Sequence, residues 1–234
     1  METKIADGTH TKLYAIDIET VTQGKRANDY TDQRKYKLGN VKDPTKIEAK
    51  LKEKRDEARS KHALSWYTGK IVSVSIVDVY GDEEDLVISG HNESDILTEL
   101  ASKLNKPCKL IGKNSKTFDF PFMVGRFMAN MITLPAVLRS KYSLYDTDDF
   151  FGFSSASSQR ARLDDYTHGI GYKNKPMEGS MVGVLYSDII LAEASGDTVA
   201  ATAGWKQLRD YNLHDSLVVK ELTVRYFGAD RMGI

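Results

Sequence analysis

The 234-residue sequence contains a single cysteine, Cys108, and has no net charge. One cysteine cannot form an intrachain disulfide, and it cannot supply a cysteine-rich zinc site. Lys and Arg together number 33, as do Asp and Glu, so the overall charge argues neither for nor against a nucleic-acid partner. Any such preference has to come from local patches of charge.

Long apolar segments are also missing. No apolar run approaches the roughly 20 residues that a membrane span requires. The first eight residues, METKIADG, lack the basic-then-apolar pattern of a signal peptide. We therefore expect a cytoplasmic protein with no membrane association. Hydrophobic residues make up 41% of the chain and charged residues 28%, an ordinary mixture for a domain with a real core.

Residues 13–20, LYAIDIET, are the most informative segment. The apolar run predicts a strand buried on both faces, as in the centre of an α/β sheet. Asp17 and Glu19 are two positions apart, so on a strand they point to the same face. Neighbouring carboxylates repel and are costly to desolvate, and a divalent metal is the usual compensation. The alternative is an edge strand with two solvated acids, and this pair alone does not decide between them.

Residue patterns along the rest of the chain predict a single α/β domain with a mixed sheet. Three strands come early, followed by helices interleaved with short strands. We expect strands at 13–20, 70–80, 85–89, 109–112 and 142–146. We expect helices at 46–59, 94–104, 117–131, 163–171 and 181–194, and a last helix from 197 to 227 interrupted at Gly204. A serine-rich loop is expected at 154–158.

The predicted helix at 46–59 has few apolar residues and many strong helix formers. Acid–base pairs four residues apart, such as Glu48 with Lys52, support it. We expect an exposed, mildly basic helix that lies on the domain. A solvated helix without a partner and a helix that contacts nucleic acid both remain open.

Two further acidic sites follow. Asn114 lies where the strand at 109–112 ends, and Asp119 enters the next helix, where an acid also complements the helix dipole. Phe118 lies beside this acid; it is a core residue by default, but an aromatic ring there could also stack on a base. Tyr211 and Asp215 are four residues apart and share the inward face of the last helix. An unpaired carboxylate on that face is costly, and a metal would remove the difficulty.

These motifs, in this order, resemble those of a known enzyme family. Asp17-x-Glu19, then Asn114-x-x-x-Phe118-Asp119, then Tyr211-x-x-x-Asp215 resemble the three motifs of the DEDD 3′→5′ exonucleases, and the tyrosine marks the DEDDy branch. Residues 163–173 and 178–182 resemble a segment that precedes the third motif in predicted exonucleases related to the proofreading domain of family B DNA polymerases. The resemblance covers residues 13–227. It implies a ribonuclease H-like α/β fold with a mixed sheet of about five strands flanked by helices.

The resemblance also implies a domain organisation. We expect one exonuclease domain over residues 1–234, with a polar and helical insertion at about 21–69 as the main departure from the family pattern. The chain ends soon after the third motif, so we expect a free-standing exonuclease.

The family's chemistry implies a role for each residue that matches its motifs. Asp17, Glu19 and Asp215 would hold the divalent ion that activates water, Asp17 would bridge to a second ion, and Asp119 would hold that one. Hard cations such as Mg²⁺ or Mn²⁺ suit these oxygen ligands. Tyr211 would orient the attacking water. The terminal nucleotide would meet Thr20, Asn114 and Phe118. Apart from the motifs, six basic residues are candidates for contacts with backbone phosphates, and each could instead be a solvated surface residue: Lys113, Lys116, Lys173, Arg160, Arg162 and Lys175.

The implied activity is hydrolysis of phosphodiester bonds from the 3′ end of single-stranded DNA, with release of nucleoside 5′-monophosphates. One alternative keeps the site but takes RNA or short oligonucleotides. A second is an inactive nucleic-acid-binding module, although all four acids are present. A third is a haloacid-dehalogenase-like phosphatase built on residues 17–21, which would normally have aspartate in place of Glu19 and leaves Tyr211 and Asp215 unexplained. The sequence leaves any protein partner unknown.

Overall fold

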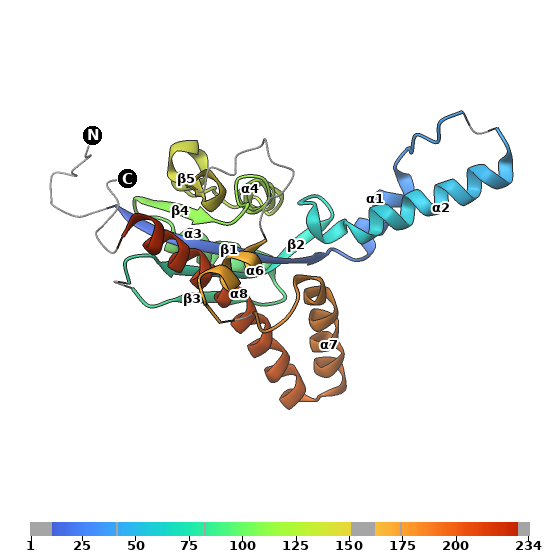
Figure 1. Cartoon of the computed structure of the whole chain (residues 1–234). Helices are drawn as coiled ribbons and strands as arrows, with labels where there is room; N and C mark the ends of the chain where they lie inside the picture. The colour runs from blue at the N-terminus through green and yellow to red at the C-terminus, as the bar shows by residue number, and fades with distance from the viewer. Residues whose placement is uncertain (1–10, 41, 82, 151–161, 174, 229–234) are drawn as a thin grey trace.

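The computed structural model describes residues 11–40, 42–81, 83–150, 162–173 and 175–228, and its centre is a mixed five-stranded sheet (Figure 1). The strand order is β3-β2-β1-β4-β5. β1 runs antiparallel to β2 and parallel to β4. The strands are β1 Lys12–Thr22, β2 Gly69–Asp78, β3 Leu86–Ser89, β4 Cys108–Gly112 and β5 Leu144–Asp146. The predicted α/β class and mixed sheet are confirmed; the serine-rich loop at 154–158 and Arg160 lie outside the described residues.

β1 is the central strand because its side chains are apolar on both faces. Ile16 and Ile18 belong to the larger core cluster, with apolar residues of α3 (Glu93–Lys103) and α4 (Asp119–Ala129). Leu13 and Ala15 belong to a second cluster, with Val219 of α8 (Thr198–Phe227). Helices therefore cover both faces of the sheet, and β1 is held rigidly between them.

The remaining helices are α1 Lys25–Gln33, α2 Pro44–Ser60, α5 Thr147–Phe150, α6 Leu163–Gly169 and α7 Val182–Ser195. All the predicted helices are present with ends shifted by a few residues, whereas α1 and the short α5 were not predicted. Short 3₁₀ turns are η1 His62–Leu64, η2 Ala136–Arg139, η3 Lys141–Ser143 and η4 Gly179–Met181. Among the described residues, no helix is both long and apolar enough to cross a membrane.

The predicted interruption at Gly204 is wrong, because α8 continues through this residue. A Cβ atom added at Gly204 would lie 2.6 Å from Cγ1 of Ile189 on α7. The glycine therefore serves close packing of α7 against α8 and does not break the helix.

The expectation that the helix at 46–59 lies on the domain is also wrong. α1 and α2 pair with each other and project away from the sheet as an arm (Figure 1). α2 has no fully buried residue. A helix with so little apolar surface gains little from packing on the sheet, since burial of apolar area is the main driving force for such contacts.

Candidate metal centre

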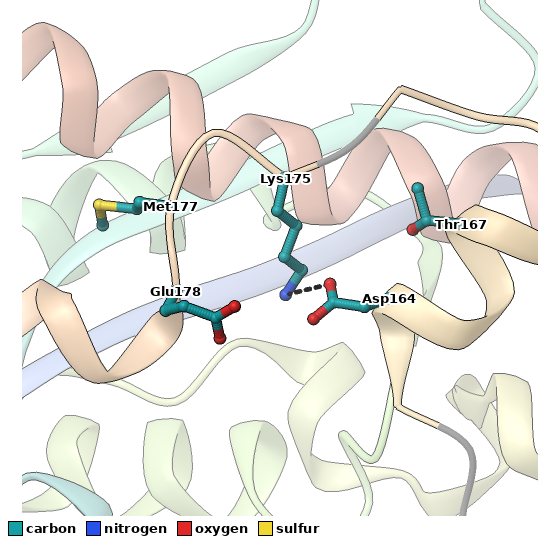
Figure 2. A pocket seen from close by; sticks show the side chains of 5 residues that line it. All are labelled: Asp164, Thr167, Lys175, Met177 and Glu178. Atoms are coloured by element: carbon teal, nitrogen blue, oxygen red, sulfur yellow. Dashed lines mark ion pairs between the residues drawn. The ribbon is translucent and has the colours of Figure 1, made fainter.

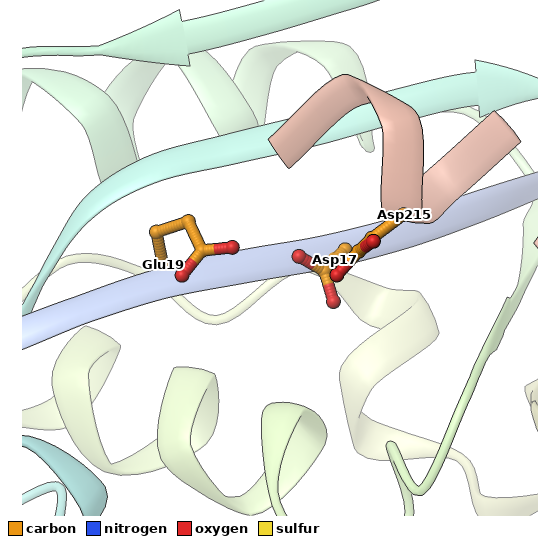
Figure 3. A group of neighbouring side chains, drawn as sticks. All are labelled: Asp17, Glu19 and Asp215. Atoms are coloured by element: carbon orange, nitrogen blue, oxygen red, sulfur yellow. The ribbon is translucent and has the colours of Figure 1, made fainter. Parts of the chain in front are cut away.

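Three carboxylates from distant parts of the sequence meet on one face of the sheet. Asp17 and Glu19 project from β1, and Asp215 comes from α8, which crosses that face (Figure 3). One carboxylate oxygen from each lies within 4.8 Å of the other two. Glu19 and Asp215 are buried, and Asp17 is partly buried. We call Asp17, Glu19 and Asp215 the carboxylate cluster.

Burial and mutual repulsion make the ionised forms of these acids costly. The pKa of Asp17 is raised well above its ordinary value, first by burial and then by the charges of Glu19, Asp215 and Asp119. The pKa of Glu19 is raised in the same way, by burial and then by Asp215 and Asp119. A bound cation would offset both effects. The donors are all carboxylate oxygens, so the cluster could hold a hard divalent ion.

Asp119 lies at the edge of this cluster, at the first residue of α4. The backbone groups of Asp119 itself and of Ile18 favour its ionised form and lower its pKa. Burial and the charges of Asp146 and Asp215 nevertheless raise the pKa of Asp119 to about 7. It is not one of the three residues whose oxygens all lie within 4.8 Å, although its charge acts on Asp17 and Glu19.

Lys175 supplies a positive charge directly at the cluster. Its Nζ atom lies 2.9 Å from Oδ2 of Asp215 and 3.6 Å from Oδ1 of Asp164. The same ammonium lies 5.4 Å from the centre of the Tyr211 ring. Beside it is a cavity of about 310 Å³ lined by Asp164, Thr167, Lys175, Met177 and Glu178 (Figure 2). The sequence suggested Lys175 as a phosphate contact, and the structure places it against a carboxylate.

Tyr211 lies one turn before Asp215 on α8 and is buried. Burial, followed by the charges of Glu19, Asp215 and Asp17, raises the pKa of its phenol far above the usual range. The hydroxyl therefore stays protonated at neutral pH. It can position a group by hydrogen bonding but cannot act as a base.

Asn212 is a site residue that the sequence did not reveal. Its side chain is fully buried, and Nδ2 donates to Oδ2 of Asp17 over 2.8 Å. Its Oδ1 accepts a hydrogen bond from Ser73 Oγ over 2.8 Å. Ser75 Oγ donates to the Asn212 backbone carbonyl over 2.9 Å. This buried polar network fixes the orientation of Asp17. The available signal was Ser73 and Ser75, two polar residues facing one way in an otherwise apolar strand.

Thr20 lies within β1, whereas Asn114 and Phe118 lie between the end of β4 and the start of α4. Thr20 comes directly after Glu19, and its Oγ1 donates to the carbonyl of Ala63 over 2.7 Å. Asn114 has a left-handed backbone with a φ of 58° and accepts a hydrogen bond from the Thr117 hydroxyl. Phe118 packs against Phe122, with ring centres 5.5 Å apart.

The three predicted lysines differ in their surroundings. Lys113 forms an ion pair with Asp148 at 2.7 Å, and Lys116 forms one with Asp149. Lys173 is exposed, and its carbonyl accepts a hydrogen bond from Nε2 of His214. Lys113 and Lys116 would have to leave their acidic partners to contact a phosphate.

Comparison with known proteins shows the fold and no more. No protein-family model and no curated protein matches the chain. Among solved structures it resembles the family B DNA polymerase from the hyperthermophilic archaeon Pyrobaculum calidifontis, with a TM-score of 0.54 and 12% identity. The match covers 95% of this chain but 26% of the polymerase, so the chain spans about a quarter of the polymerase's length.

Proposed function

We propose that this protein is a metal-dependent 3′→5′ exonuclease of the DEDDy type with a ribonuclease H-like fold. Its substrate would be single-stranded DNA, and its products nucleoside 5′-monophosphates. The observation that carries the proposal is the convergence of Asp17, Glu19 and Asp215 from two distant segments, with Asp119 beside them. One solved structure with a similar fold is a DNA polymerase, which agrees with a nucleic-acid substrate.

Each residue has a defined part in this proposal. Asp17, Glu19 and Asp215 would hold one Mg²⁺ or Mn²⁺, and Asp17 with Asp119 would hold a second. When bound, such ions lower the pKa of water and stabilise charge on the phosphate. Tyr211 keeps its proton and orients the attacking water through its hydroxyl. The amide of Asn212 prevents Asp17 from rotating.

The same geometry argues against a phosphatase that uses Asp17 as a nucleophile. A nucleophilic carboxylate has to be ionised and free to attack. Here one oxygen of Asp17 accepts a hydrogen bond from Asn212, and the side chain faces the carboxylates of Glu19 and Asp215. Two neighbouring acids would also repel an anionic substrate in the absence of metal.

The proposal is tested with DNA and RNA oligonucleotides of one sequence, labelled at the 5′ end and incubated with Mg²⁺ or Mn²⁺. We expect progressive shortening from the 3′ end, faster for DNA, that requires the metal. Asp215→Asn should reduce the rate by more than the roughly 10–100-fold typical of groups that only support a metal ligand. Asp210→Asn, an exposed position on the same helix, is the matched control and should leave the rate unchanged.

Each outcome is informative. If the wild-type protein shows no metal-dependent shortening, the enzyme proposal fails. Faster loss of RNA would replace the DNA preference with an exoribonuclease. Full activity of Asp215→Asn would place the active site elsewhere.

A further inference from the structure

The neutral net charge of the chain conceals a strong segregation. Residues 25–61, which form α1, α2 and the segment between them, contain 13 Lys or Arg and seven Asp or Glu. Because the whole chain is neutral, the rest carries an equal excess of negative charge, which includes the carboxylate cluster. We call residues 25–61 the basic arm. Figure 1 shows that it projects away from the sheet.

The positive charge of the basic arm is largely unpaired. Its internal ion pairs use Asp32, Asp56 and Glu57. Within the described residues, seven exposed Lys or Arg side chains of the arm have no interaction partner, among them Lys25, Lys46 and Lys52. Such a surface attracts a polyanion.

Residues 62–68 follow the basic arm directly, and we call them the base of the arm. Hydrogen bonds join them to the strand that carries the acids and to the residue that follows it. Thr20, next to Glu19, donates through Oγ1 to the carbonyl of Ala63 over 2.7 Å. The Gln23 backbone N–H donates to the carbonyl of Thr68 over 2.8 Å. A buried hydrogen bond of 2.6 Å joins Thr31 of α1 to His62 in the base of the arm. The arm therefore holds a defined position relative to the carboxylate cluster.

Three aromatic side chains are half exposed where the arm meets the sheet. Tyr30, Trp66 and Tyr67 have 45%, 43% and 42% of their surface exposed. The rings of Tyr30 and Tyr67 lie 5.2 Å apart, and those of Trp66 and Tyr67 lie 5.7 Å apart. Trp66 packs over Gly125 of α4, where an added Cβ would be 2.5 Å from the indole. We call these three residues the junction aromatics.

Exposed aromatic rings beside a basic surface are the combination that binds single strands without reading sequence. Rings stack on bases, whereas cations contact the backbone phosphates. Exposed apolar surface costs free energy, so an arm that only faces solvent gives no reason for three exposed rings at one place. A bound strand would cover the rings and pair with the cations.

We propose that the basic arm and the junction aromatics bind the single-stranded nucleic acid whose 3′ end enters the carboxylate cluster. The unpaired lysines contact its phosphates, and Tyr30, Trp66 and Tyr67 stack on bases a few nucleotides from the end. Thr20 links the carboxylate cluster to the arm, since it follows Glu19 in the chain and its hydroxyl donates a hydrogen bond to the base of the arm. The identity of the end that enters the cluster rests on the proposed function, whereas binding by the arm does not.

Binding is measured by fluorescence anisotropy with a labelled 20-nucleotide thymidylate strand in EDTA, which prevents hydrolysis. The triple variant Lys25→Gln, Lys46→Gln, Lys52→Gln should bind at least several-fold more weakly. The slope of log affinity against log salt should fall by about 2, since each single-strand phosphate contact contributes about 0.7. The matched control neutralises three exposed lysines away from the arm, Lys106→Gln, Lys141→Gln and Lys206→Gln, and should retain wild-type affinity and slope.

The stacking part is tested separately at Tyr67. Tyr67→Leu should lower affinity about 5-fold or more, the size of one lost stacking contact, with the salt slope unchanged. Tyr67→Phe keeps the ring and should bind as the wild type does. Thermal unfolding of each variant shows whether the fold is intact.

A small substrate separates this proposal from the proposed function. The p-nitrophenyl ester of thymidine 5′-monophosphate is too short to reach the arm. With Mn²⁺, the arm triple variant should hydrolyse it at the wild-type rate but show a raised KM on the 20-nucleotide strand. If the wild type hydrolyses neither substrate, the proposed function fails while the binding data still test the arm. If the triple variant binds and degrades the long strand as the wild type does, or if the arm binds an acidic protein and no nucleic acid, the arm proposal is wrong.

Discussion

Replacing Asp119 with asparagine should stabilise the metal-free protein at pH 8. Burial raises the pKa of this carboxyl from 3.8 to about 7 in the folded state. The folded state therefore binds more protons than the unfolded state between these values, and stability falls as pH rises through that window. At about 1.36 kcal/mol per pKa unit, the full loss above pH 7 is about 4 kcal/mol.

Asparagine has no charge at any pH, so the variant does not lose stability at this position as the pH rises. Its carbonyl oxygen is still an acceptor that can face the backbone of Ile18, which favours negative charge at this position. About 4 kcal/mol is an upper limit, because Asp17 and Glu19 take up protons in the same cluster. A gain of about 1–4 kcal/mol corresponds to a Tm increase of roughly 2–16 °C for a chain of this size.

The assay is thermal unfolding followed by circular dichroism in EDTA at pH 5 and pH 8. The gain should be larger at pH 8, where the wild-type carboxyl is ionised. Added Mg²⁺ should raise the Tm of the wild type. At a concentration 100 times the Kd, the gain in the free energy of unfolding is about 2.7 kcal/mol, and the gain should be smaller for Asp119→Asn.

Asp146 provides the matched control for this prediction. Its Oδ1 accepts hydrogen bonds from the backbone N–H groups of Asn114 and Asp148, and its Oδ2 accepts one from the backbone N–H of Lys116. Asn at this position would place an NH₂ group against a donor, so Asp146→Asn should destabilise at both pH values. If Asp119→Asn also lowers the Tm equally at both pH values, the argument from charge repulsion in the cluster is refuted.

Three further variants test two polar contacts of the carboxylate cluster and the packing of α7 against α8. Asn212→Ala frees the Asp17 carboxylate and should weaken Mn²⁺ binding by about 10–100-fold in calorimetry; unchanged affinity would remove its positioning role. Gly204→Ala should cost about 1–3 kcal/mol despite the better helix propensity of alanine, and Ile189→Ala in the same chain should recover part of it in a double-mutant cycle. Lys175→Gln removes the ammonium from the carboxylate cluster, so the Tm in EDTA should fall. The increase in Tm on addition of Mg²⁺ should become larger, because the ion then replaces the missing positive charge. A smaller increase than in the wild type would show that the lysine supports metal binding.

Much of the fold was predictable because its signals are local. The apolar run of β1 and the alternation in β2 reflect burial that is visible in a few consecutive residues. The acids at Asp17, Glu19 and Asp215 also stood out, because each is a carboxylate attached to an apolar element. The structure brings these three together, as the ordered motifs suggested.

Other features depend on contacts between distant segments, which no local pattern contains. Gly204 looked like a helix break, yet its effect is decided by Ile189 on the neighbouring helix. The position of Lys175 depends on how the loop before α7 meets α8. The sequence by itself determined which strand carries the acids and predicted that their charges need compensation. Only the tertiary structure decided that Asn212 holds Asp17 and that the basic arm projects away from the sheet, because both follow from packing between segments far apart in the chain.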